Sequence, residues 1–290
     1  MLFVLLWSTG FVVARYATED AGPLTFLAVR LAGAGLMLWT VATVTGAPSI
    51  APRQVGWAAL SSLGMNTLYL GGVFVAIDHG LPTGLSALIA GVHPVITSVV
   101  ARWALRERLR RIQWLGIALG LLGVIAVVVQ KFSAHTGTIT LAAMVAMTVS
   151  VLGMSAGTLV QRARGAAMPL LRGAAVQFLT SSAMLLVAAV FVEHWRFHPT
   201  ARLWWSLAWA MFVLSIASVL IMLMLLQRQA AARVSSLFFL TPALSTIEGA
   251  VLFDESIAPI IVIGLVISLL GVYLTVRQPQ PPFGPGDAAT

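Results

Sequence analysis

Long apolar stretches, separated by short breaks, dominate the pattern of the chain. Many of the stretches approach the roughly 20 residues that an α-helix needs to cross a bilayer core of about 30 Å. The breaks contain Gly and Pro, which mark helix starts and stops. The pattern predicts ten membrane-spanning helices, at residues 1–16, 24–45, 55–77, 82–104, 112–130, 137–162, 169–192, 203–227, 232–253 and 258–276.

Composition agrees with an integral membrane protein of the all-α class. Hydrophobic residues make up 59% of the chain and charged residues only 9%, far below the roughly one quarter that is usual in soluble proteins. The formal charge of +8 is spread over short junctions between apolar stretches, which favours orientation signals over nucleic-acid binding. The chain has no cysteine, so disulfides and thiolate metal sites are excluded.

The two ends of the chain differ. Residues 1–14 are apolar but lack the basic residues that precede a signal-peptide core, and further spans follow at once, so we expect the first membrane span there. Residues 278–290 carry Pro and Gly without apolar periodicity. That composition predicts a disordered tail.

One sequence pattern occurs twice, 148 positions apart and without a gap. Its copies place Pro94 against Pro242 and Glu107 against Glu255, and both end in Leu-Leu-Gly-Val. Five arginines surround Glu107, whereas only Asp254 adds charge beside Glu255. Because basic loops stay on the cytoplasmic side, the two copies are expected to have opposite orientations. Inverted repeats of this kind are typical of secondary transporters.

The distribution of basic residues predicts the orientation. With the N-terminus inside, twelve Lys and Arg fall in cytoplasmic junctions and four in outer junctions, so we expect both termini in the cytoplasm. Five helices per copy is an odd number, so duplication turns the second copy over. The predicted organisation is a first five-helix repeat at 1–131, a second, inverted repeat at 132–277 and the tail at 278–290.

At this point the chain resembles a known family, the EamA branch of the drug/metabolite transporter superfamily. The resemblance rests on LLWSTGFVVARY, PLTFLAVR, HPVITSVVARWALRERL, TPALSTIEGAVLFDES and the LLGV ends of the fifth and tenth spans. It implies a ten-helix monomer in the bacterial inner membrane, with a central cavity between two five-helix halves. It also implies export of small metabolites, and amino-acid exporters of the YddG type are the members that the chain resembles.

Glu248 is the first candidate site residue. A charge at mid-helix costs ~2.5 to 3.5 kcal/mol on insertion scales, so such residues usually face a cavity or a partner. Glu248 follows Thr241 and Ser245 on one helical face, at spacings of seven and three. It would receive a proton or hold the amino group of a substrate. The alternative is a carboxyl near the outer helix end that is solvated or paired with Arg30 or another basic group.

His93 is the second candidate and stands directly before Pro94. Histidine changes its charge near physiological pH, which suits proton coupling. The alternative is a neutral ring bonded to a backbone carbonyl that the proline leaves free. We expect His93 to line the cavity in both cases. Pro94 and Pro242 are predicted hinges because both disrupt their helices at equivalent places, and the alternative is a pair of static kinks.

Asn66 and Tyr69 belong to a polar stripe that begins at Ser62 in the third span. Such a stripe either lines a pocket with polar anchors and aromatic walls or bonds helix to helix, at about 0.6 kcal/mol per contact. We include Asn66 and Tyr69 in the candidate substrate site. Trp7 joins them because of its place in the first-span motif of the family.

Small residues recur at equivalent places in the fifth and tenth spans: Gly116, Gly120 and Gly123, then Gly264, Ser268 and Gly271. They predict close helix contact, either as a dimer seam or within each half. Arg30 would bind a substrate carboxylate, or it would snorkel or pair with an acid. His194 and His198 have no third ligand, so no metal site is expected.

The leading hypothesis is a secondary exporter of small metabolites, most of all amino acids including aromatic ones, that works by alternating access. The sequence contains no GxxxxGK[ST] motif and no HExxH motif, which argues against nucleotide hydrolysis, a cofactor and an enzymatic function. The alternative is a facilitative channel or a scramblase-like pore for other small solutes or lipids. The expected partners are the solute and membrane lipid, and not nucleic acid.

Overall fold

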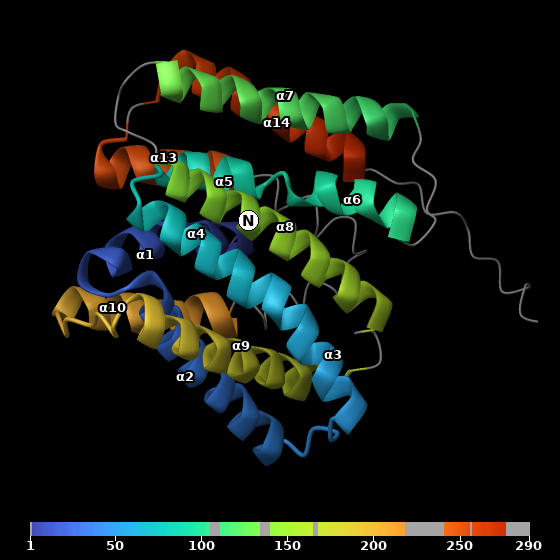
Figure 1. The fold of residues 1–290 in the computed structure, drawn as a ribbon, viewed down its shortest axis with the longest axis vertical. Helices are drawn as coiled ribbons and strands as arrows, with labels where there is room; N and C mark the ends of the chain where they lie inside the picture. Colours follow the sequence, from blue (N-terminus) through green and yellow to red (C-terminus); the bar gives the residue numbers. More distant parts are fainter. Residues whose placement is uncertain are drawn as a thin grey trace, which may run out of the picture.

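The computed structural model of the chain is a bundle of helices (Figure 1). It describes residues 2–104, 111–133, 140–164, 168–217, 241–255 and 257–276. Within these ranges no β-strand forms, and one isolated bridge joins Ala21 to Phe197. The predicted all-α class is therefore confirmed.

The helices follow the predicted spans to within a few residues. Their bounds are α1 Leu2–Asp20, α2 Pro23–Val44, α3 Pro52–Ser62, η1 Leu63–Leu68, α4 Tyr69–Asp78, α5 Thr83–Ala90, α6 His93–Ala104, α7 Arg111–Ser133, α8 Leu141–Arg164, α9 Leu170–Val192, α10 Ala201–Ala208, η2 Trp209–Ala217, α13 Thr241–Phe253 and α14 Pro259–Val276. The predicted spans 203–227 and 232–253 lie partly outside the described residues. Within the described ranges, the stretches long and apolar enough to cross a membrane are Pro23–Val44, Pro52–Asp78, Leu141–Gln161 and Leu170–Glu193.

Helix ends coincide with proline and glycine. Pro23 and Pro52 occupy the first turn of α2 and α3, where the missing amide proton costs nothing. Gly46 and Gly80 follow α2 and α4 with φ of 65° and 88°, a left-handed conformation that glycine adopts without strain. These residues explain why the spans end where the sequence predicts.

Two predicted spans are not single α-helices. In the third span, the π-helical segment η1 separates α3 from α4. The fourth span is broken at Gly91 and Val92, between α5 and α6. This break lies directly before His93 and Pro94, because proline disturbs the preceding helical turn. A second π-helical segment, η2, follows α10, and the offset of 148 places Leu63 of η1 at position 211, inside η2.

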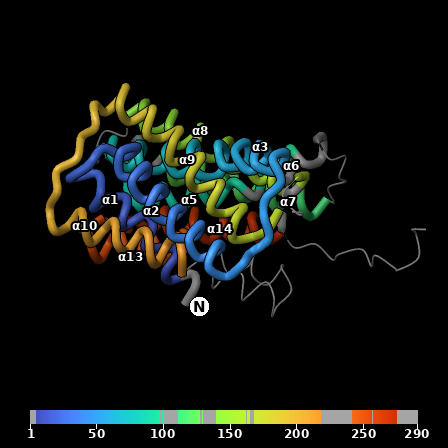
Figure 2. The backbone as a smooth tube through the Cα atoms, turned by 90° about the horizontal axis from the view of Figure 1, so that it is seen from below, coloured from blue at the N-terminus to red at the C-terminus, as the bar shows by residue number. Residues whose placement is uncertain are grey.

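Helices of the first 131 residues pack against helices of the rest of the chain. In Figure 1, α7 and α14 lie side by side at one edge of the bundle, and α2 and α9 lie together near the opposite edge. Between them α5 contacts α13, and α4 contacts α8. Figure 2 shows the same bundle as a tube, seen from below. The contacts between the two parts of the chain therefore run through the whole bundle.

The small residues of α7 and α14 face each other. A Cβ added to Gly123 would lie 2.6 Å from the backbone nitrogen of Ser268, and one added to Gly271 would lie 2.6 Å from Cα of Gly120. Such distances leave no room for any side chain. The expectation that these residues pack each helix within its own half is therefore wrong: they hold α7 against α14, from the two parts of the chain.

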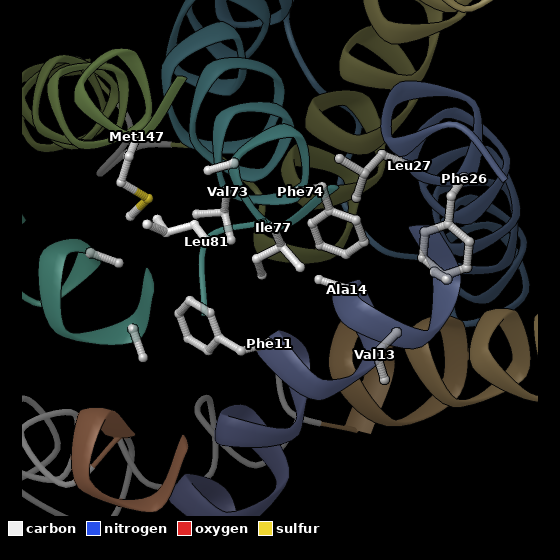
Figure 3. Close-up of a cluster of buried hydrophobic side chains, with 14 of the residues drawn as sticks. Phe11, Val13, Ala14, Phe26, Leu27, Val73, Phe74, Ile77, Leu81 and Met147 are labelled. Carbon is white, nitrogen blue, oxygen red and sulfur yellow. The ribbon is translucent and has the colours of Figure 1, made fainter. Parts of the chain in front are cut away.

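The main apolar cluster lies where α1, α2, α4, α5 and α8 meet (Figure 3). Phe26 and Phe74 stack there with ring centroids 5.7 Å apart, and Phe11 and Met147 fill the side toward α5 and α8. Large apolar side chains also cover the outside of the bundle, as Phe191 does with 78% exposure. This exposure suits contact with lipid and not with water.

Candidate functional site

Glu248 lies on α13 and faces α1. The Ser8 hydroxyl donates to Glu248 Oε1 at 2.6 Å, and the Ser245 hydroxyl donates to the Ser8 carbonyl at 3.3 Å. The predicted alignment of Ser245 and Glu248 on one helical face is therefore confirmed. The other carboxyl oxygen, Oε2, is enclosed and accepts no hydrogen bond from the residues that the structure describes. A buried acceptor without a partner is costly, so Glu248 has one oxygen available for a proton or for a donor group of a solute.

Ser8 can serve Glu248 in either protonation state. Its hydroxyl lies 3.0 Å from the Leu5 carbonyl as well as 2.6 Å from Glu248 Oε1, and it carries a single proton. An ionised Glu248 takes that proton as a hydrogen bond. A protonated Glu248 would donate to the Ser8 oxygen instead, and the hydroxyl would turn to Leu5. The contact thus accommodates a carboxyl that gains and loses a proton.

The alternative that Glu248 pairs with Arg30 is wrong. Arg30 lies on α2, and its Nε donates to the Ser215 hydroxyl at 3.3 Å. The Ser215 hydroxyl in turn donates to the Ala210 carbonyl at 3.0 Å, within the π-helical segment η2. Arg30 and Glu248 therefore have separate surroundings.

His93 bonds to the carbonyl that its neighbouring proline leaves free. Its Nδ1 lies 3.0 Å from the carbonyl oxygen of Ala90, which is four residues before Pro94 and lacks its helical donor for that reason. Because a carbonyl only accepts, Nδ1 carries a proton and donates. The His93 carbonyl accepts from Thr97 and Ser155 at 2.7 and 3.2 Å. The alternative of a ring bonded to a backbone carbonyl is confirmed.

The stripe in the third span takes part in contacts between helices. The Ser62 hydroxyl lies 3.0 Å from the Thr180 hydroxyl of α9, as the alternative reading of this stripe expects. The Tyr69 carbonyl accepts from Ser150 of α8 at 2.8 Å, and the Tyr69 ring packs against the main apolar cluster. Asn66 lies in η1 and is half-buried.

The structure therefore brings the candidate residues together in two groups. Trp7 directly precedes Ser8, the residue that donates to Glu248, on α1. Tyr69 and His93 are both anchored to α8, at Ser150 and Ser155. Pro242 packs against Gly91, because a Cβ on that glycine would lie 3.2 Å from Pro242 Cγ, while the side chain of Pro94 lies outside the described residues.

Two carboxylates that the sequence did not suggest cap helices of the first half. Glu193, after α9, accepts from the backbone nitrogens of Leu24 and Thr25 at 2.8 and 2.9 Å. Glu255, after α13, accepts from the backbone nitrogens of Thr83 and Gly84 at 2.7 and 3.3 Å. Negative charge is favourable at a helix N-terminus, where backbone N–H groups have no helical partner. These caps tie the start of α2 and of α5 to the second half.

Ion pairs join the same end of the bundle. Arg202 binds Asp20 through Nε at 2.8 Å and also contacts Glu19, and Arg196 lies 3.0 Å from Asp78. The hydrogen bond from Arg202 holds the pKa of Asp20 below its ordinary value, and the Thr200 hydroxyl acts in the same direction. A small hollow between α5, α13 and α14, lined by Leu88, Thr246, Glu255 and Ile261, also opens here, away from Glu248.

The fold and these interior polar groups define a membrane transporter. The sequence model of the EamA-like transporter family matches residues 1–129 and 141–277, so the chain belongs to that family. The resemblance seen in the sequence is thereby confirmed. Since the named relatives are transporters or efflux pumps, the expectation that the chain is not an enzyme is confirmed as well.

The relatives agree with this class. Over 121 residues the chain is 30% identical to the "Uncharacterized inner membrane transporter YedA" of Escherichia coli (strain K12), a match that spans 42% of this chain and 39% of YedA. Over 287 residues it is 25% identical to a "Probable amino-acid metabolite efflux pump" of Salmonella typhimurium, across 95% of this chain and 93% of the pump. A solved structure described as "Crystal structure of protein" has the same fold, with a TM-score of 0.64 at 18% identity over 94% of each chain.

Proposed function

We propose that the protein is a secondary exporter of small metabolites in the bacterial inner membrane, with amino acids, including aromatic ones, as its solutes. In this proposal, ten helices form two inverted repeats, residues 1–131 and 132–277, with both termini in the cytoplasm. The monomer alternates access to a central path between the halves. The name of the Salmonella relative, an amino-acid metabolite efflux pump, supports the choice of solute.

One observation carries the proposed mechanism: equivalent helices of the two copies pack against each other. The offset of 148 relates α2 to α9 and α7 to α14, and both pairs are in contact. The π-helical segments η1 and η2 also occupy equivalent places. Two similar units that meet along matched helices can rock against each other, which is the motion that alternating access requires. Pro94 and Pro242 are the proposed hinges.

Glu248 is the proposed centre of the solute path, together with Trp7, Asn66, Tyr69 and His93. Its unpartnered oxygen provides an acceptor for the ammonium group of an amino acid or for a proton. Ser8 supports both roles, because its hydroxyl can donate to the carboxylate or accept from the acid.

Transport into liposomes that contain the purified protein tests the proposal. We expect labelled amino acids to enter with saturation and to show counterflow, at one or both of two internal pH values. The Glu248→Gln variant should lose any pH dependence, because the amide cannot take up the proton. Asp254→Asn, at an exposed position, is the matched control and should keep it.

Three outcomes would contradict parts of this proposal. If no amino acid moves, the choice of solute is wrong. A flux that rises linearly with concentration and shows no competition would identify a channel or a scramblase-like pore in place of a carrier. An unchanged pH dependence in Glu248→Gln would remove Glu248 from the coupling role.

A further inference from the structure

Arg30 is a buried charged residue whose role the proposed function leaves open. It is only 6% exposed, and it lies seven residues after Pro23, the first residue of α2. At a rise of about 1.5 Å per residue, it sits roughly 10 Å from that helix end. An ionisable residue at such depth in a membrane span is costly and usually serves a functional site.

None of the ion pairs formed by acidic residues of the described chain involves Arg30. Asp20 and Asp78 pair with Arg202 and Arg196. Glu193 and Glu255 cap α2 and α5, and Glu248 bonds to Ser8. Within the described ranges, no carboxylate therefore lies within ion-pair distance of Arg30. Its positive charge is left without a counter-ion from this part of the protein.

The contact with Ser215 fixes one edge of the Arg30 guanidinium. Nε donates to the Ser215 hydroxyl at 3.3 Å, and that hydroxyl donates its own hydrogen bond to the Ala210 carbonyl. The two terminal nitrogens, Nη1 and Nη2, donate to no residue that the structure describes. The planar end of a guanidinium with two parallel N–H groups matches the two oxygens of a carboxylate.

The surrounding helices hold this arginine in place and away from lipid. One turn further along α2, a Cβ on Gly33 would lie 3.0 Å from the sulfur of Met211 in η2. On another side of α2, the Ser182 hydroxyl of α9 donates to the Ala28 carbonyl at 2.7 Å. On the η2 side, Trp209 donates from Nε1 to Thr9 of α1 at 2.9 Å. Arg30 thus lies where α2 meets η2, the helix that also touches α1 beside Ser8.

We propose that Arg30, oriented by Ser215, binds the carboxylate of the transported solute through Nη1 and Nη2. The inference rests on the proposed function and narrows its solutes to molecules with a free carboxylate. A carboxylate supplies the missing counter-ion and two acceptors at once. An amide or a decarboxylated analogue leaves the guanidinium unpaired, and a site that is built for hydrogen bonds rejects an analogue that cannot make them.

Competition between each amino acid and its own amide tests the inference. Proteoliposomes take up labelled leucine or phenylalanine in the presence of the unlabelled acid, leucinamide or phenylalaninamide. For the unchanged protein we expect the amide to need at least about a tenfold higher concentration than the acid for half inhibition. Arg30→Gln should bring this ratio to about one. Arg30→Lys should keep part of the preference for the acid, because the ammonium retains the charge but lacks the two parallel N–H groups of the guanidinium.

The ratio of amide to acid concentration does not depend on how much of each variant folds correctly. The ratio is measured on one sample, so the amount of active protein cancels. Arg53→Gln removes an exposed arginine at the start of α3 and should leave the ratio unchanged, whereas Ser215→Ala should lower it a few-fold. If Arg30→Gln does not fold, Arg30→Lys and Ser215→Ala decide the question with the same ratio.

The inference is overturned if the unchanged protein does not distinguish acid from amide, or if the folded Arg30 variants keep the full preference. Either result leaves amino-acid transport itself intact. If the unchanged protein moves no amino acid, the proposed function fails instead. In that case the uptake of labelled lactate is measured in the presence of unlabelled lactate or lactamide, and the same ratio is calculated. Stronger inhibition by lactate would support carboxylate binding by Arg30, and equal inhibition would overturn it.

Discussion

The two ends of the helix bundle are held together in different ways. We call the end that bears Asp20, Asp78, Glu193 and Glu255 the acidic end. There, carboxylates of the second half accept from backbone nitrogens of the first half, and ion pairs add to them. The arginine end, defined by Arg53, Arg111, Arg164 and Arg172, lies at the opposite ends of the same helices.

Arginine side chains make the corresponding contacts at the arginine end. The Arg172 Nε donates to the Ala47 carbonyl at 3.1 Å, and its guanidinium lies 5.1 Å from the ring centre of Trp39. Arg164 lies 4.9 Å from the ring centre of Trp57. Exposed cation–π contacts contribute about 0.5 to 1 kcal/mol each, whereas hydrogen bonds to a charged group contribute about 1.5 to 3 kcal/mol.

The acidic end is held more firmly than the arginine end, because its contacts are carboxylate caps and ion pairs and not cation–π contacts. Glu193 and Glu255 each accept from two backbone N–H groups that have no helical partner, so the loss of either carboxylate leaves several donors unpaired. A lost cation–π contact leaves nothing unpaired. In the orientation that we propose, the firmly held end faces outward, and opening toward the outside requires Glu193 and Glu255 to release α2 and α5.

The largest effect is expected for Glu193→Ala. This change removes the acceptor of the Leu24 and Thr25 nitrogens and of the Thr25 hydroxyl, so we expect a loss of about 2 to 3 kcal/mol in the free energy of unfolding. Thermal unfolding in detergent measures the loss, and hydrogen exchange should show faster exchange at the start of α2. Glu255→Ala should cost less, because its bond to Gly84 is longer, at 3.3 Å.

Asp254→Asn is the control for this pair. It neutralises a carboxylate next to Glu255 that is exposed and has a φ of 54°, a conformation that Asn also tolerates. We expect no change in unfolding or exchange. If Asp254→Asn destabilised the protein as much as Glu255→Ala, general charge and not capping would hold the acidic end.

A smaller effect is expected from pH acting on Asp20. Its folded pKa lies below the unfolded value because Arg202 donates to it, so its contribution is complete above about pH 4 and is lost as the pH falls through the folded pKa. The unfolding temperature should therefore drop as the pH falls below about 4. Asp20→Asn should reduce that drop, and an identical pH profile would contradict the assigned role of the pair.

The smallest effect is expected for Arg172→Gln at the arginine end. The variant loses the contact with Trp39 and weakens the bond to Ala47, which should cost about 0.5 to 1 kcal/mol in the free energy of unfolding. The same thermal unfolding experiment measures it. A loss as large as that of Glu193→Ala would remove the difference between the two ends.

The sequence predicted most helices because each depends on local signals. Apolar length, Pro23 and Pro52 at helix starts and glycine at helix ends all act within a few residues. The break before Pro94 follows from the same local chemistry, and so does the bond from His93 to the Ala90 carbonyl. The π-helical segments were missed because no residue type in η1 or η2 distinguishes them from an ordinary helix.

The candidate site was predictable only in part. The spacing of Ser245 and Glu248 placed both on one face, but it did not identify Ser8 as their partner, 240 residues away from Glu248. Glu193 and Glu255 were missed for the same reason, since they cap helices 169 and 172 residues distant. The glycines of α7 and α14 predicted close packing but not the partner helix. The spacing of small residues shows which face of a helix packs closely, whereas the tertiary structure determines which helix lies against that face.

The central claim is that one five-helix unit is present in two opposite orientations, and labelling of single cysteines from each side of the membrane tests it most directly. The chain has no cysteine of its own, so Arg108→Cys, outside the described residues, and Asp254→Cys provide one target each at equivalent junctions of the two copies. A thiol reagent that cannot cross the membrane should reach position 254 from the periplasm and position 108 only from the cytoplasm. Labelling of both positions from the same side would contradict the account.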